Sequence, residues 1–276
     1  EAGLTTNTSV ERCEFFPLNE IKTELDTFLE GCREVNFITF SGAGEPTLYL
    51  RLGELVDWLK VKHSSQKICL LTNGVLIGEA NMPEELKNLD LIVPSLDAAD
   101  ENTFQKINKP ASGLTLTKLV DSIKNFRSRN KCQMWLEIFV VPGLNDSDAE
   151  LAKFAEIINK IKPDKIQLNG LDRPGVEKSV HKPDVLVLDK FAQSLSHIAP
   201  VENIVRQDNA AKIASQQTEN MDSISKLVRR RPCTAEEIKK IFSLDTESCD
   251  KIIRELLASG EFRMEKMPDG VFLKRK

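Results

Sequence analysis

The sequence predicts an α/β protein in which a parallel sheet is followed by a smaller domain of helices and a hairpin. Through roughly the first 200 residues, short apolar runs alternate with amphipathic segments of helical period. Alternation of this kind builds βα units around a parallel sheet. After a polar stretch at 207–220, the pattern changes to three short helices and two alternating strands. The chain is therefore expected to contain two domains.

Six short apolar runs are expected to form strands, because a buried parallel strand appears as a short continuous apolar run. They span 35–40, 67–72, 91–96, 134–141, 166–168 and 203–205. Pro94 lies inside the third run, so that strand is expected to be irregular. The amphipathic segments between the runs are expected to form helices at 18–31, 52–62, 83–89, 114–127, 146–161 and 186–198, with Asp146 as an N-cap.

The C-terminal stretch is expected to form helices at 221–230, 235–241 and 245–257, followed by a β-hairpin. Thr234 and Glu237 have the spacing of a capping box at the start of the second of these helices. Pro268-Asp269-Gly270 separates two alternating runs, as a hairpin turn does. Three short helices followed by a hairpin resemble a winged helix. Basic residues slightly outnumber acidic ones here, which allows phosphate contacts without requiring them.

The composition is that of an ordinary globular protein, with 276 residues, 41% hydrophobic and 29% charged. The formal net charge of −4 gives no general attraction to nucleic acid or an anionic membrane. No apolar run approaches the ~20 residues that cross a bilayer. The polar N-terminus has no signal peptide and no Met, so we expect a cytoplasmic protein fragment with reduced cysteines. Cys69 and Cys132 are expected to be buried.

One loop is a candidate binding loop. It follows the first apolar run and has the sequence Ser41-Gly42-Ala43-Gly44-Glu45-Pro46. Gly42 and Gly44 let the backbone approach a ligand closely, and Pro46 ends the hydrogen-bonded ladder. Ligands of open α/β sheets and barrels bind at the C-terminal ends of strands. The loop is therefore either part of a binding site or an ordinary turn with a solvated Glu45.

Four further strand ends carry polar residues or glycine in corresponding places. The five ends are Ser41 to Pro46, Thr72-Asn73-Gly74, Ser95-Leu96-Asp97, Val141-Pro142-Gly143 and Gln167-Leu168-Asn169. Each alone is compatible with ordinary turn chemistry. Because the ends of parallel strands meet at one rim, five of them together favour a site.

The stretch from Ser41 to Pro46 resembles the Gly-Gly-Glu-Pro element of radical S-adenosylmethionine (radical SAM) enzymes, and the resemblance covers about the first 200 residues. Within that family, Ser95 to Pro110 and Leu168 to Gly175 are most similar to a branch with wyosine-type tRNA-modifying enzymes and uncharacterised Fe–S oxidoreductases. The resemblance implies that S-adenosylmethionine (SAM) binds at the strand ends, with its amino end at Glu45 and the loop backbone. The implied cofactor-binding residues are Ser41, Gly42, Gly44, Glu45, Pro46, Asn73, Gly74, Ser95, Asp97, Val141, Pro142, Gly143 and Asn169.

The family's C-x₃-C-x₂-C signature, which holds a 4Fe–4S cluster, is absent from this sequence. We expect the cluster cysteines and the first strand upstream of Glu1, the alternative being a family member that has lost the cluster. The resemblance implies that an external one-electron donor drives reductive cleavage of SAM to a 5′-deoxyadenosyl radical, which takes hydrogen from a substrate. This chain alone is expected to be inactive. RNA, protein and a small metabolite all stay open as substrates, and no catalytic residue is assigned.

The resemblance implies a partial (βα)₆ TIM-type barrel at 1–206, without its first strand and cluster loop. A linker at 207–220 and a winged-helix-like domain at 221–276 are expected to follow. The competing hypothesis is a non-catalytic module that binds nucleic acid or protein through the winged helix.

Glu137, Arg173 and the three histidines are ionisable residues outside these motifs. Glu137, in the middle of an apolar strand, either points into a polar lumen or faces the surface. Arg173 either contacts substrate or forms an exposed ion pair of little energetic weight. The histidines are expected to be surface residues rather than ligands or bases: His63, His181 and His197.

Overall fold

The computed structural model describes residues 11–31, 35–42, 44–171, 180–204, 221–242, 244–267 and 270–276. The described residues form two compact units, one made by 11–171 with 180–204 and the other by 221–276. The predicted linker at 207–220 and Arg173 lie outside the described residues. No helix in the described ranges is both long and apolar enough to cross a membrane.

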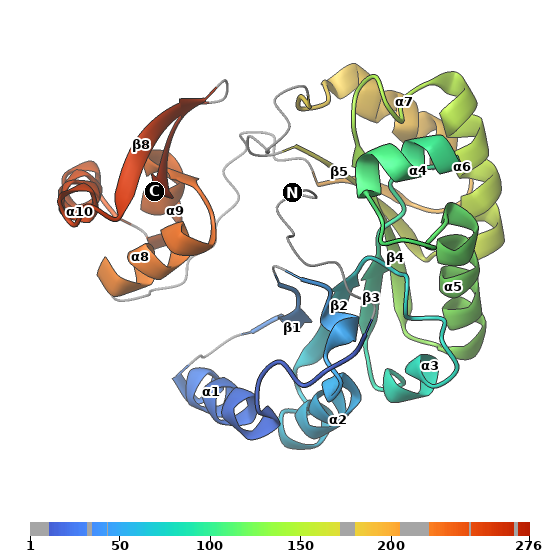
Figure 1. Ribbon diagram of the computed structural model, residues 1–276, viewed down its shortest axis with the longest axis horizontal. Coiled ribbons are helices and arrows are strands. Elements are labelled where there is room, and N and C mark those ends of the chain that lie inside the picture. The colour runs from blue at the N-terminus through green and yellow to red at the C-terminus, as the bar shows by residue number, and fades with distance from the viewer. Residues whose placement is uncertain are drawn as a thin grey trace. The chain divides into compact units, whose positions relative to one another are not determined.

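The first unit contains a six-stranded sheet in which strand order follows sequence order and every pair is parallel. The sheet curves, and the helices lie on its outer side (Figure 1). This confirms the predicted α/β fold and agrees with a partial TIM-type barrel. The strands are β1 (Phe37–Phe40), β2 (Lys67–Thr72), β3 (Leu91–Pro94), β4 (Gln133–Val140), β5 (Lys165–Gly170) and β6 (Val201–Asn203).

The outer face of the sheet is the main core of this unit. Strand residues such as Leu70, Leu136 and Leu168 are fully buried there, in one cluster with Phe126 and Phe154 of the helices. The elements between the strands are α1 (Leu18–Gly31), the 3₁₀ turn η1 (Pro46–Leu48), α2 (Leu52–Lys62), α3 (Met82–Glu85), α4 (Glu101–Asn108), α5 (Leu116–Arg129), α6 (Asp148–Ile161) and α7 (Val185–Leu195).

The inner face of the sheet changes character along the strands. Towards the strand starts, Trp135 packs on a small apolar cluster of Cys69, Leu91 and Val93. The Lys165 Nζ lies 4.1 Å from the Trp135 ring centroid, a cation–π contact. One step further along the strands, pairing register places four polar residues side by side, and we call them the polar inner layer: Ser95, Glu137, Gln167 and Glu202.

Several predicted boundaries are corrected by local hydrogen bonds. The third ladder ends at Pro94, which has no N–H, although Ser95 still forms an isolated bridge with Glu137. The helix predicted from 146 begins at Asp148, because Ser147 and not Asp146 is its N-cap. The sixth strand is β6 at 201–203 rather than 203–205. Neither η1 nor α4 was predicted.

The three histidines and two of the cysteines can be compared with the prediction. His181 and His197 are exposed, as predicted. His63 is not a surface residue: its Nε2 lies 2.8 Å from Asp26 Oδ1, and its ring packs edge-on against Trp58. Cys69 is buried as predicted, whereas Cys132 is half-buried. Burial raises the pKa of the Cys69 thiol to about 11 and that of Cys132 to about 12, so both thiols are protonated at neutral pH.

The second unit contains the expected three helices and hairpin around its own core. Thr234 and Glu237 form the predicted capping box: Thr234 N–H donates to Glu237 Oε2 at 2.9 Å, and Glu237 N–H to Thr234 Oγ1 at 3.2 Å. Leu273 and Ile238 are among its fully buried residues. The elements are α8 (Met221–Arg230), β7 (Cys233–Thr234), α9 (Ala235–Phe242), α10 (Thr246–Ala258), β8 (Phe262–Met267) and β9 (Gly270–Arg275), with antiparallel strand order β7-β9-β8.

Candidate functional site

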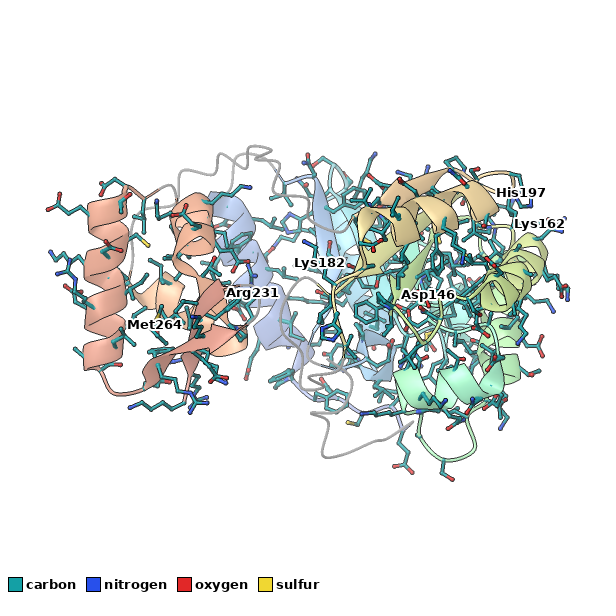
Figure 2. All side chains as sticks on the ribbon, turned by 90° about the horizontal axis from the view of Figure 1, so that it is seen from above. Asp146, Lys162, Lys182, His197, Arg231 and Met264 are labelled. Carbon is teal, nitrogen blue, oxygen red and sulfur yellow. The ribbon has the colours of Figure 1, made fainter. Side chains whose placement is uncertain are left out.

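The five predicted strand ends all lie at one edge of the sheet. The strands are parallel, so residues that follow them share one end, while residues that precede them share the other. Figure 2 shows Asp146, after β4, and Lys182, after β5, at the first end, and Lys162 and His197 at the opposite end. Hydrogen bonds join the first four strand ends to one another, and strand pairing joins the fourth to the fifth.

Glu45 connects the first two strand ends. Its Oε1 accepts hydrogen bonds from the Thr47 N–H (3.1 Å), the Thr47 hydroxyl (2.6 Å) and the Thr72 hydroxyl (2.6 Å). Within the described residues, its Oε2 accepts one hydrogen bond, from the Asn73 N–H at 2.7 Å. Oε2 thus has fewer protein donors than Oε1 and has room for a further donor from a ligand, while Oε1 fixes the side chain.

The turn after β2 assigns different roles to Asn73 and Gly74. Asn73 is exposed, and its Oδ1 accepts the Val75 N–H at 3.0 Å. Gly74 has φ +79° and is buried: its N–H donates to Thr72 Oγ1, and its carbonyl accepts from the Ser122 hydroxyl. A Cβ on Gly74 would lie 2.9 Å from a Leu119 methyl. Glycine is therefore favoured here by the positive φ, and any side chain would also displace the Leu119 side chain of α5.

Asp97 ties the third strand end to the fourth. Its Oδ1 accepts the Phe139 N–H at 3.0 Å, and its Oδ2 accepts from the Asn108 side chain at 2.8 Å. Burial raises the pKa of this carboxyl, while the bonds from Phe139 and Asn108 oppose the rise. Both carboxylate oxygens thus have protein donors, and Asp97 acts first as a structural link.

Asn145 is a residue that the sequence did not single out. It is fully buried, and its Nδ2 donates to the carbonyls of Asp97 and Phe139, both at 2.8 Å. Its Oδ1 accepts the Val141 N–H at 2.8 Å. One amide therefore fixes the start of the predicted Val141-Pro142-Gly143 contact segment against the end of β3. The available signal was a single Asn shortly after Gly143.

Glu137 faces the interior, which decides between its two predicted orientations. It alternates along β4 with the buried outer-face residues Leu136 and Ile138, and it is half-buried. Burial and the neighbouring Asp97 charge raise the pKa of Glu137, while a hydrogen bond with Asn169 opposes the rise. The fourth strand end is joined to the fifth by strand pairing, in which Phe139 lies opposite Asn169.

Open space lies next to two of the predicted glycines. A Cβ built on Gly44 or on Gly143 would meet nothing within 4 Å. A Cβ on Gly42 would meet only Gly44 backbone atoms, at 3.9 and 4.0 Å. Ser41, Gly42 and Asn73 are exposed as well. Exposed backbone of this kind suits a ligand held at close range, so these residues are compatible with a ligand such as SAM.

The described residues do not fit an iron–sulfur cluster. Within the described ranges, no group of three His, Cys, Asp or Glu side chains is placed to hold a metal ion. Cluster ligation needs Cys thiolates, and the raised pKa values of Cys69 and Cys132 keep both thiols protonated.

Comparison with known families decides the class of protein. The model of the Radical SAM superfamily matches residues 5–155, more than half of the chain. The chain belongs to the radical SAM superfamily. The matched range includes β1 to β4 and the strand ends that follow them.

Individual proteins extend the likeness beyond this range. The chain is 30% identical to a protein named GTPase Obg from Brachyspira hyodysenteriae, over 98% of this chain but 40% of that protein. It is 25% identical to the UPF0026 protein MJ1312 from Methanocaldococcus jannaschii, over 95% of this chain and 81% of that one. A radical SAM methyltransferase structure from Sphaerobacter thermophilus superposes with TM-score 0.54 and 18% identity, over 67% of this chain and 55% of that one. This last likeness concerns the fold alone.

Proposed function

We propose that this radical SAM chain binds SAM across the C-terminal ends of β1 to β5. Ser41, Gly42, Gly44 and Pro46 form the loop for the amino end, together with Oε2 of Glu45. Asn73, Ser95, Asp97 and Asn169 supply polar groups for the ribose, and Val141, Pro142 and Gly143 border the adenine. Gly74 shapes the turn that presents Asn73.

The observation that supports this proposal is that neighbouring strand ends are connected to one another along one edge of the sheet. Hydrogen bonds run from Asn73 N–H to Glu45, from Ser95 N–H to the Thr72 carbonyl and from Phe139 N–H to Asp97. Strand pairing of Phe139 with Asn169 extends this connection to the fifth strand. A site whose parts are fixed before the ligand arrives loses less entropy on binding. When bound, SAM supplies the 5′-deoxyadenosyl group for radical chemistry, and this chain's residues hold and orient it.

Two glycines provide a matched test of the site. Gly143 has φ +79° and Gly113 has φ +81°, and a Cβ on either meets no atom within 4 Å. Gly143→Ala and Gly113→Ala therefore introduce similar backbone strain, about 1 kcal/mol each. We expect only Gly143→Ala to weaken SAM binding in equilibrium dialysis. Equal SAM affinities in the two variants would remove the segment after β4 from the site.

For the second unit we propose a winged-helix-like domain whose partner is a protein rather than nucleic acid. Its order of helices and strands has the expected pattern. Four cations are neutralised locally: Glu265 pairs with Arg263 and Lys274 of the hairpin, and Glu261 pairs with Arg229 of α8 and Arg275 of the hairpin. These paired charges are less available to replace counterions on a phosphate backbone. A steep loss of RNA or DNA binding with added salt would contradict this assignment.

A further inference from the structure

Glu137 differs from two neighbouring acids, Asp97 and Glu202, in the protein groups that contact its carboxylate. Asp97 receives hydrogen bonds on both oxygens from Phe139 and Asn108. Glu202 forms an ion pair with Lys165 at 3.2 Å and accepts from the Gln167 amide at 3.2 Å. Among the described residues, no cation lies within ion-pair distance of Glu137, and the neutral Asn169 is the side chain that favours its charged form.

A half-buried carboxylate without a cation is unfavourable, because the protein does not replace the water that burial removes. The surroundings of Glu137 do not correct this: Ser95 and Gln167 beside it are neutral, and Asp97 is negative. Glu137 pairs with Gln167, two residues before Asn169, so it lies on the inner face just before the strand ends. Within the described part of the chain this position lacks a positively charged complement, and a cationic group of a ligand would supply it.

We propose that Glu137 binds a positively charged nitrogen of the substrate, an ammonium or guanidinium group. The assignment of that ligand as the substrate rests on the proposed function, because SAM at the rim would lie beside the same inner face. A charged nitrogen would form a charge-assisted hydrogen bond with the carboxylate. Glu137 is thus a specificity-determining residue for cationic substrates, which include both free amines and basic peptide side chains.

The test uses cationic probes and their neutral counterparts on the full chain. The first pair is butylguanidinium and butylurea, and the second is acetyl-Gly-Arg-Gly-amide and the same peptide with citrulline. The two pairs distinguish a small cationic molecule from a basic peptide side chain as the source of the charge. Dissociation constants are measured by NMR titration for the wild type, Glu137→Gln and Glu202→Gln. Glu202→Gln is the matched control, because it removes an acid of the same layer that already has a cation.

We expect at least one cationic probe to bind the wild type more tightly than its neutral counterpart, and Glu137→Gln to weaken it by about tenfold. Glu202→Gln should leave that affinity unchanged. Equal binding of the charged and neutral probes to the wild type would overturn the proposal, as would equal losses in the two variants. Glu137→Met serves as a second variant if Glu137→Gln does not fold.

SAM affinity, measured on the same proteins, separates this proposal from the proposed function. If SAM does not bind the wild type but the charge preference persists, the proposed function fails and the assignment of Glu137 as a cation site stands. If Glu137→Gln weakens SAM as much as the cationic probe, Glu137 belongs to the cofactor site and the inference is wrong.

Discussion

The hydroxyl of Thr72, at the end of β2, donates a hydrogen bond to Oε1 of Glu45, which follows β1, at 2.6 Å. Glu45, the acid expected to contact a ligand, therefore also links two strand ends by hydrogen bonds. Its two oxygens divide these roles, since Oε1 accepts three protein donors and Oε2 accepts one. Removing the Glu45 side chain would disturb both roles. A substitution at Thr72 therefore tests the link between the strand ends separately.

Thr72→Val should destabilise the protein by about 1–3 kcal/mol, because it replaces a hydroxyl by a methyl of similar volume. Glu45 Oε1 would lose one donor, and the buried Gly74 N–H would lose its acceptor. Urea unfolding measures the loss, and equilibrium dialysis should show weaker SAM binding. Thr72→Ser keeps the hydroxyl and is the control. If Thr72→Val is as stable as Thr72→Ser, the Thr72 hydroxyl does not stabilise the link between these strand ends.

Asn145→Asp should be strongly destabilising at neutral pH, by roughly 2–4 kcal/mol, because it buries a charge and removes both N–H donors. The new carboxylate would face the carbonyl oxygens of Asp97 and Phe139. A protonated acid can donate one hydrogen bond, so part of the stability should return as the pH falls. Urea unfolding at pH 5 and pH 8 measures this, and Asn145→Ala, which has no such pH dependence, is the control.

Glu150 and Asp100 form a carboxyl pair behind the end of β3. Glu150 is 4% exposed, and its Oε2 accepts the Ala99 N–H at 3.2 Å. Burial and the hydrogen bond with Asp100 raise the pKa of Glu150, and that same hydrogen bond lowers the pKa of Asp100. The pair is therefore most stable with its proton on Glu150, and Lys153 lies 3.0 Å from the ionised Asp100.

Glu150→Gln should gain stability relative to the wild type as the pH rises. A carboxyl whose pKa is raised by folding contributes stability below its unfolded pKa and loses it as the pH rises through the folded pKa. A glutamine keeps the neutral form, with an N–H for Asp100 and an oxygen for Ala99. Urea unfolding from pH 5 to pH 9 measures the difference between the two proteins. A difference that stays constant with pH would show that Glu150 does not hold the proton.

The parts of the site that the sequence predicted are those whose chemistry is local. The glycines and the Pro46 loop follow directly after apolar runs, so their place at the rim depends only on strand direction. The capping box of Thr234 and Glu237 was predictable for the same reason, since both partners lie within one turn.

The parts that were missed depend on partners far away in sequence. Asn145 bonds to Asp97, 48 residues earlier, and His63 bonds to Asp26, 37 residues earlier. The packing role of Gly74 depends on Leu119 of α5. Polarity at these positions suggested a turn or a solvent-facing side chain, because nothing in the local pattern indicates a buried partner. Glu137 stayed ambiguous until strand register fixed its face.

The positions of the aromatic residues have a consequence for spectroscopy. The chain has two tryptophans and one tyrosine. Trp58 lies on α2 beside His63, Trp135 lies on the inner face beneath Lys165, and Tyr49 follows η1. All three belong to the α/β unit. Intrinsic tryptophan fluorescence will therefore follow that unit alone, with each tryptophan near a cation or ring that can quench it, and unfolding of the C-terminal unit will be visible only by a backbone signal such as circular dichroism.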